Sequence, residues 1–141
     1  MKSEITNIMI KEHEIIKNLL TEFEKTHNRN SLNAKRIFDK FMWNLEKHML
    51  IEEKILSSVY SIWNMNMEGM FEILNDHGDI MILVNRIKNS YYDESDIFLL
   101  MEFIQDHFAL EETILYPNLE KVLNGDEKEF LIERAQEIIR A

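Results

Sequence analysis

The sequence predicts an all-α protein: an up-down-up-down antiparallel four-helix bundle with a short C-terminal fifth helix. Its 141 residues include only three glycines and one proline, whereas Leu, Ile, Glu, Lys and Met, which favour helices, are abundant. Four long stretches repeat apolar residues at helical spacing, and short polar segments separate them. Short connections favour antiparallel neighbours, so we expect residues 1–141 to form a single domain.

The first two helices are predicted at about Thr6–Lys25 and from Ser31 to about Val59. The polar segment His27-Asn-Arg-Asn separates them, and Ser31 is a good N-cap because its hydroxyl can accept a hydrogen bond from a first-turn N–H group. Each helix has one inward stripe. These stripes comprise Met9, His13, Ile16, Leu20 and Phe23 in the first helix, and Ile37, Phe41, Leu45, His48, Glu52 and Ile55 in the second.

The second half repeats this arrangement. A turn at Ser61–Glu68 leads to the third helix, and a polar break at Asn89–Ser95 leads to the fourth, which Pro117 should end or kink near Tyr116. A capping box of Asp126 and Glu129 is predicted to open a fifth helix that reaches about Arg140. The three stripes comprise Met70, Ile73, Leu74, His77, Met81, Val84 and Ile87; Leu100, Phe103, Ile104, His107, Leu110, Glu111 and Ile114; and Phe130, Leu131, Ala135, Ile138 and Ile139.

The pattern His-x-x-x-Glu-Glu-x-Ile-Leu occurs twice, at His48–Leu56 and at His107–Leu115. Residues four apart share one face of a helix, so each copy places an imidazole nitrogen beside a carboxylate oxygen. His13 and His77 each add one inward histidine to the other helix of their half. This set of donors is what a two-metal site in a helix bundle requires.

Helix lengths place these donors at one depth. At 1.5 Å per residue, His13 and His48 both lie roughly 20–24 Å from the first loop. By the same calculation, His48 and His77 lie at similar distances from the second loop, and His77 and His107 from the third. The two glutamates lie one helical turn further along. Taken singly, an inward histidine is more often a hydrogen-bonded core residue. Together the donors predict bound cations, because unpaired buried carboxylates cost several kcal/mol.

The sequence also contains a fifth histidine, His27, and a second glutamate in each motif, Glu53 and Glu112. His27 lies about 21 Å along the helix from His13, so we expect it at a helix end or in a loop, outside the site. Glu53 and Glu112 have two equally supported interpretations. They either accept a hydrogen bond from the ring N–H of a metal-binding histidine or remain solvated charges at the rim.

These motifs resemble the hemerythrin-like (HHE cation-binding) family over nearly the whole chain. The matching segments are Glu12-His13-Glu14-Ile15-Ile16, His48-x-x-x-Glu52-Glu53, Asp76-His77 and His107-x-x-x-Glu111-Glu112-x-x-Leu115-Tyr116-Pro117. The resemblance implies a non-haem di-iron centre, with a bridging oxide or hydroxide between two Fe ions. It also implies the ligands: His13 and His48 for one iron, His77 and His107 for the other, and Glu52 and Glu111 as bridges.

Two departures refine the resemblance. Oxygen-carrying hemerythrins have a fifth histidine where this chain has Ile73, and a His-x-x-x-x-Asp spacing where it has His107-x-x-x-Glu111. The four-His, two-Glu set more closely resembles bacterial di-iron proteins linked to the repair of damaged iron centres and to nitric oxide stress. Those proteins usually have an additional Cys-containing domain, whereas this sequence has no Cys.

Ligand counting indicates the chemistry. Six protein donors and one bridging oxygen leave about one open position on each iron, where O2, NO or peroxide would bind. Manganese and zinc are alternatives, since nitrogen and oxygen donors suit them as well. Walls formed by Ile73, Leu74, Phe103, Ile104 and Leu110 are expected to favour small neutral molecules. Turnover of NO or peroxide would make the protein an enzyme, and nothing in the sequence requires it.

Composition limits the other possibilities. The net charge of −10 disfavours nucleic acid and anionic membranes as partners. No apolar run approaches the roughly 18 residues of a membrane span, and the first residues do not read as a signal peptide, so a cytoplasmic location is expected. Absence of Cys excludes disulfides, thiolate metal sites and cysteine catalysis. The alternative functions are iron donation to damaged centres and a metal-free helical interaction module, and no protein partner is indicated.

Overall fold

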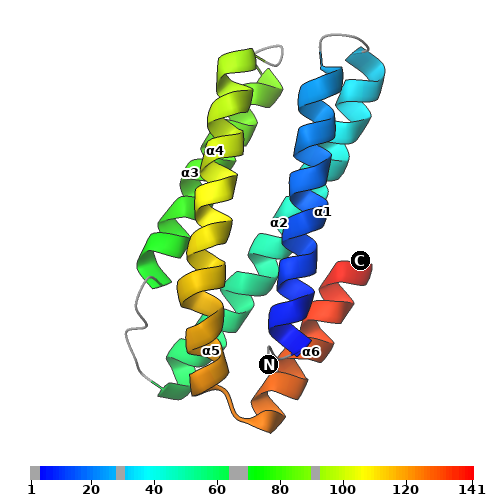
Figure 1. Ribbon diagram of the computed structural model, residues 1–141. Coiled ribbons are helices and arrows are strands. Elements are labelled where there is room, and N and C mark those ends of the chain that lie inside the picture. The colour runs from blue at the N-terminus through cyan, green and yellow to red at the C-terminus, as the bar shows by residue number, and fades with distance from the viewer. Residues whose placement is uncertain (1–3, 28–30, 64–69, 90–92) are drawn as a thin grey trace.

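A computed structural model describes residues 4–27, 31–63, 70–89 and 93–141, and this part of the chain is almost entirely helical (Figure 1). The four long helices are α1 (Glu4–Thr26), α2 (Ser31–Trp63), α3 (Met70–Asn89) and α4 (Glu94–Leu110). A π-helical turn, η1 (Glu111–Leu115), continues α4 and is followed by α5 (Tyr116–Val122) and α6 (Gly125–Arg140). The predicted all-α class is confirmed.

The long helices form an up-down-up-down bundle. In Figure 1 the chain rises through α1, descends through α2, rises through α3 and descends through α4. Each long helix contacts two others, so that α1, α2, α3 and α4 close into a ring. α6 packs on α1 and α2, at the end of the bundle where α1 begins. The short C-terminal helix is therefore an addition to the four-helix bundle, as predicted.

The second helix is longer than predicted. α2 includes residues 61–63, which were predicted as part of a turn. The rest of that turn, residues 64–69, lies outside the described residues, as do residues 28–30 and 90–92 in the other two predicted breaks. α2 begins at Ser31, whose predicted capping side chain also lies outside the description.

The start of α6 corrects one prediction. Asn124 Oδ1 accepts a hydrogen bond of 2.8 Å from Glu127 N, and Glu127 Oε1 accepts one of 2.9 Å from Asn124 N. This is a capping box two residues before the one predicted with Asp126 and Glu129. Asn124 has the extended backbone of an N-cap residue, so the helix begins directly at Gly125.

The interior consists of two apolar clusters. One cluster contains Ile16, Phe41, Ile80 and Phe108, and the other contains Met9, Ile51, Ile73 and Leu115. On each long helix the switch from one cluster to the other occurs at the predicted metal-binding positions. The predicted donors therefore form a polar layer between two hydrophobic halves, which hold the helices together above and below it.

The π-helical turn changes the end of the fourth helix. Tyr116 N donates a hydrogen bond to Glu111 O, five residues earlier, instead of to the fourth residue back. Pro117, which has no N–H to donate, sits in the first turn of α5, and the helix continues to Val122. Of the two predicted effects of the proline, ending the helix near Tyr116 is therefore wrong. The wider π-turn before it supplies the backbone adjustment.

Several predicted core residues are exposed. Leu74, Phe103 and Phe130 are 37%, 38% and 57% exposed, so placing them on inward stripes was wrong. Phe108, which was not predicted, is fully buried instead. The helical period alone does not say how far neighbouring helices cover each face of a helix, and α6 packs mainly on α1 and α2. Within the described ranges, none of the helices combines the length and apolar character needed to cross a membrane.

Candidate metal centre

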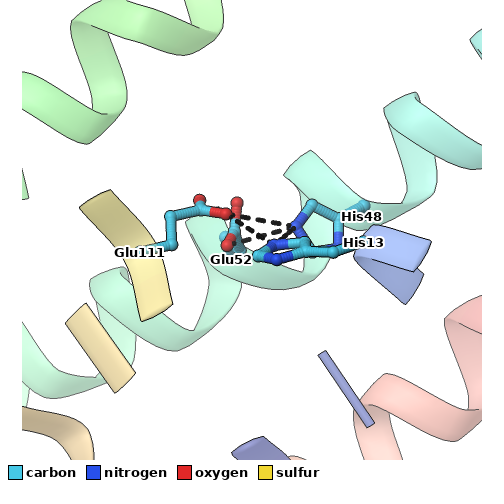
Figure 2. A group of neighbouring side chains, drawn as sticks. All are labelled: His13, His48, Glu52 and Glu111. Atoms are coloured by element: carbon cyan, nitrogen blue, oxygen red, sulfur yellow. Dashed lines mark hydrogen bonds and ion pairs between the residues drawn. The ribbon is translucent and has the colours of Figure 1, made fainter. Parts of the chain in front are cut away.

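Four histidines, one from each long helix, point into the polar layer. These are His13 of α1, His48 of α2, His77 of α3 and His107 of α4, and each is at most 4% exposed. They come from helices that run in alternating directions, so their meeting confirms that they share one depth. Figure 2 shows two of them turned toward Glu52 and Glu111.

The histidines form two pairs. His13 and His48 have ring centroids 4.6 Å apart, and their Nε2 atoms lie 3.0 Å from each other. His77 and His107 have ring centroids 4.9 Å apart. A separation of 3.0 Å between two imidazole nitrogens requires a proton or a cation between them, because two facing lone pairs repel each other.

Glu52 connects the two histidine pairs from α2. Its Oε1 lies 3.0 Å from His77 Nε2, and its Oε2 lies 3.3 Å from His48 Nε2. The carboxylate is 1% exposed. One oxygen therefore faces each pair, which is the arrangement of a carboxylate that bridges two cations.

Glu111 makes the same connection from η1. Its Oε1 lies 2.8 Å from His13 Nε2, and its Oε2 lies 2.9 Å from His107 Nε2. Two groups of four donors result, and both include the two glutamates; the atoms of each group lie within 4.8 Å of one another. The groups are His13, His48, Glu52 and Glu111, and His77, His107, Glu52 and Glu111.

Outer carboxylates orient three of the imidazoles. Glu112 Oε2 lies 2.8 Å from His13 Nδ1, Asp76 Oδ2 lies 3.2 Å from His107 Nδ1, and Glu53 Oε1 lies 3.4 Å from His77 Nδ1. An Nδ1–H that donates outward leaves the lone pair of Nε2 facing the centre, as metal binding requires. Of the two interpretations of Glu53 and Glu112, the geometry favours hydrogen bonding, most strongly for Glu112.

Three further residues at the centre, Asp76, Tyr116 and Phe108, were not predicted to have a role there. Asp76 directly precedes His77, but that position alone does not show that its carboxylate contacts His107 on the next helix. The Tyr116 hydroxyl lies 2.9 Å from Glu52 Oε2 inside the centre. The Phe108 ring stacks on His13 at 3.7 Å between centroids. Phe108 lies four residues after the buried Ile104, so the regular helical period could have placed it inward. Tyr116 faces the centre because of the π-turn, which a regular helical period does not contain.

The hemerythrin HHE cation binding domain family matches residues 4–119 of this chain, a range that includes all six predicted donors. The chain belongs to this family. The match and the two buried His–Glu groups together identify a metal-binding hemerythrin domain. No curated protein and no solved structure matches the chain.

The buried histidines and glutamates of this hemerythrin domain stabilise one another's charged forms. Burial opposes protonation of His48, but Glu52 and Glu111 outweigh it and raise the pKa of His48 to about 10. The pKa of His77 rises to about 10 for the same reasons. Burial would raise the pKa of Glu111, yet hydrogen bonding to Glu52 and to the histidines keeps that pKa well below its usual value. Without metal, protons on the imidazoles therefore supply the positive charge that cations would supply.

Two buried polar atoms of this hemerythrin domain indicate that it suits cations. His107 Nε2 and Glu111 Oε2 are buried, and no hydrogen-bond partner satisfies either atom among the described residues. Their separation of 2.9 Å is that of an ion pair, without the alignment of a hydrogen bond. Unsatisfied buried atoms of this kind need an explanation, and a cation bound to both atoms provides one.

A cavity of about 490 Å³ reaches one side of the hemerythrin centre. His107 lines it, together with four carboxylate side chains: Glu72, Asp76, Asp79 and Asp106. Phe103 and Leu110 of the predicted apolar wall also line this cavity, so the wall on this side is mixed instead of apolar. Ile73 and Ile104 are buried as predicted. His27 lies at the end of α1 with its ring 5.9 Å from that of Phe23, and it belongs to neither donor group.

Proposed function

We propose that this hemerythrin domain holds two iron ions and uses them to bind, sense or detoxify a small oxidant such as O2, NO or peroxide. The supporting observation is that two four-donor groups share both of their carboxylates. This arrangement suits two cations held close together. Imidazole and carboxylate donors without thiolate suit iron, with manganese and zinc as competitors.

The protein's own residues prepare the centre. His13 and His48 would hold one ion and His77 and His107 the other, while Glu52 and Glu111 would bind both. Glu112 and Asp76 orient the rings of His13 and His107 through their outer nitrogens. Bound iron would supply open coordination positions and reversible one-electron chemistry.

Enclosure of the centre supports a small ligand. Both bridging glutamates and all four histidines are at most 4% exposed. Apolar clusters close the bundle on both sides of the polar layer along its length. The cavity of about 490 Å³ is lined by only one of the six donors, His107. An oxidant of two or a few atoms therefore fits the centre better than a large substrate.

Anaerobic loading with ferrous iron, followed by metal counting, tests the proposal. We expect about two irons per chain in the natural protein and a clear loss in His77→Ala. The matched control is His27→Ala, which removes a histidine outside the donor groups and should retain both irons. Absence of bound iron in the natural protein, or equal stoichiometry in His77→Ala, would reject the assignment. Spectra of the reduced protein exposed separately to O2, NO and peroxide then identify the oxidant.

The acidic cavity favours a second candidate, an iron-handling protein that donates iron to damaged centres. Carboxylates of Glu72, Asp76, Asp79 and Asp106 adjoin His107 and would attract a cation that enters or leaves the centre. Rapid transfer of iron to a chelator, slowed in Asp79→Asn and Asp106→Asn, supports this function. Slow release that is unaffected by those substitutions supports a resident centre instead.

A further inference from the structure

We propose that Tyr116 is a seventh ligand of the centre, binding through its phenol oxygen to the cation held by His13 and His48. The inference rests on the proposed function and deepens it, because it decides which of the two cations keeps a free position for the oxidant. The ligand set inferred from sequence gives both cations equal numbers of protein donors. Tyr116 makes them unequal.

The first argument is the position of the hydroxyl. Tyr116 Oη lies 3.0 Å from His13 Nε2, 2.9 Å from Glu52 Oε2 and 3.4 Å from Glu111 Oε1. His48 Nε2 lies 3.0, 3.3 and 3.4 Å from the same three atoms. The phenol oxygen therefore contacts the same donors that the imidazole nitrogen of His48 contacts.

These spacings are those of ligands around one cation. Metal–nitrogen and metal–oxygen bonds of about 2.1 Å, set at right angles, place neighbouring donor atoms about 3.0 Å apart. All six separations just given lie between 2.9 and 3.4 Å. A cation among these atoms would have His48 and Tyr116 on opposite sides and His13, Glu52 and Glu111 between them.

The backbone holds the phenol in this place. Tyr116 is 2% exposed and follows directly after η1, whose hydrogen bond from Tyr116 N to Glu111 O spans five residues. In a regular helix the residue four positions after Glu111 would lie over it, and that residue is Leu115. The π-turn brings Tyr116 to the centre instead. Such turns are frequent at functional sites.

The two cations consequently differ in free positions. With Tyr116, the His13–His48 cation has five protein donors, and a bridging oxygen would complete six. The His77–His107 cation has four protein donors, and the same bridge leaves one position free. We infer that the oxidant binds at the His77–His107 cation, on the side where His107 lines the acidic cavity. On ligation the phenol O–H bond breaks, an oxygen–metal bond forms, and the proton passes to solvent.

Visible absorption of the ferric protein provides the test. A phenolate bound to ferric iron gives a charge-transfer band and resonance-enhanced tyrosine vibrations. We expect both in the natural protein and neither in Tyr116→Phe, which keeps the ring and loses only the oxygen. Metal counting comes first: failure of the natural protein to bind two irons rejects the proposed function. Two irons with no such band, or an unchanged band in Tyr116→Phe, rejects only the tyrosine assignment.

Azide, a small anion that binds free positions on ferric iron, gives a second measurement. The natural protein should bind about one azide per centre, and Tyr116→Phe about two, since the substitution opens the second cation. Equal azide stoichiometry in both proteins would contradict ligation. Should Tyr116→Phe fail to fold, natural protein containing ring-deuterated tyrosine replaces it. Shifted Raman bands then support tyrosine ligation, and unshifted bands reject it.

Discussion

Glu112 Oε2 lies 2.8 Å from Nδ1 of His13, a residue 99 positions away in the sequence and on another helix. The contact joins η1 to α1 and turns the other nitrogen of the imidazole toward Glu111 and His48. Glu112 follows directly after Glu111, so one turn supplies both a carboxylate to the centre and a carboxylate that orients one of its histidines.

Removing this orienting charge should weaken metal binding without removing a donor. We predict that Glu112→Gln lowers iron affinity by about 10- to 100-fold, the usual effect of losing such a partner. Glu14→Gln, an exposed acid on α1, is the control and should leave affinity unchanged. Competition with a chelator of known affinity measures both. Equal affinities in Glu112→Gln and Glu14→Gln would show that Glu112 is only a solvated charge.

The sharing of Glu111 predicts a difference in stoichiometry. Glu111 belongs to both donor groups, whereas His13 belongs to one. Glu111→Ala should therefore lose both irons, and His13→Ala should retain about one. Metal counting on the two purified variants separates a bridging carboxylate from one that serves a single ion. Retention of one firmly bound iron in Glu111→Ala would contradict the bridging role.

The pKa values of His48 and His77 predict how pH affects the metal-free protein. Folding raises both from 6.5 to about 10, so between these values the folded state binds more protons than the unfolded state. Stability of the metal-free protein should therefore fall as pH rises through this window. Thermal unfolding across it measures the slope. A double His48→Gln, His77→Gln variant should show a smaller decline, and an equal decline would assign the effect to other groups.

The apolar clusters should contribute stability that is separate from metal binding. Phe41 is fully buried, and Phe41→Ala should lower the free energy of unfolding by about 3–5 kcal/mol. Phe98 is 50% exposed, so Phe98→Ala serves as the control and should change stability little. Denaturant unfolding measures both. If Phe41→Ala and Phe98→Ala were equally destabilised, the assigned core would be incorrect.

The features that could be predicted from the sequence are those whose geometry is local and regular. His48 with Glu52, and His107 with Glu111, are related by one helical turn, and helix lengths alone bring His13 and His77 to the same depth. These relations depend only on the rise and period of a helix. The bundle and the meeting of its six inward donors could therefore be predicted from the sequence.

The missing features depend on departures from that regularity. Nothing in the residue pattern distinguishes a hydrogen bond to the fourth residue from one to the fifth, so Tyr116 was read as a helix end beside Pro117. The exposure of Leu74 and Phe103 depends on how far each neighbouring helix covers α3 and α4. Asp76 on α3 contacts His107 on the neighbouring α4, and the rotation of each helix about its own axis determines whether these two side chains meet.

Anomalous diffraction from crystals of the iron-loaded protein, recorded at the iron absorption edge, tests the paired centre most directly. We expect two peaks separated by about 3.5–4 Å, the usual spacing of two-metal sites. One peak should lie between His13 and His48, and the other between His77 and His107, with Glu52 and Glu111 reaching both. A single peak in this layer, or iron bound only at surface carboxylates, would contradict the account.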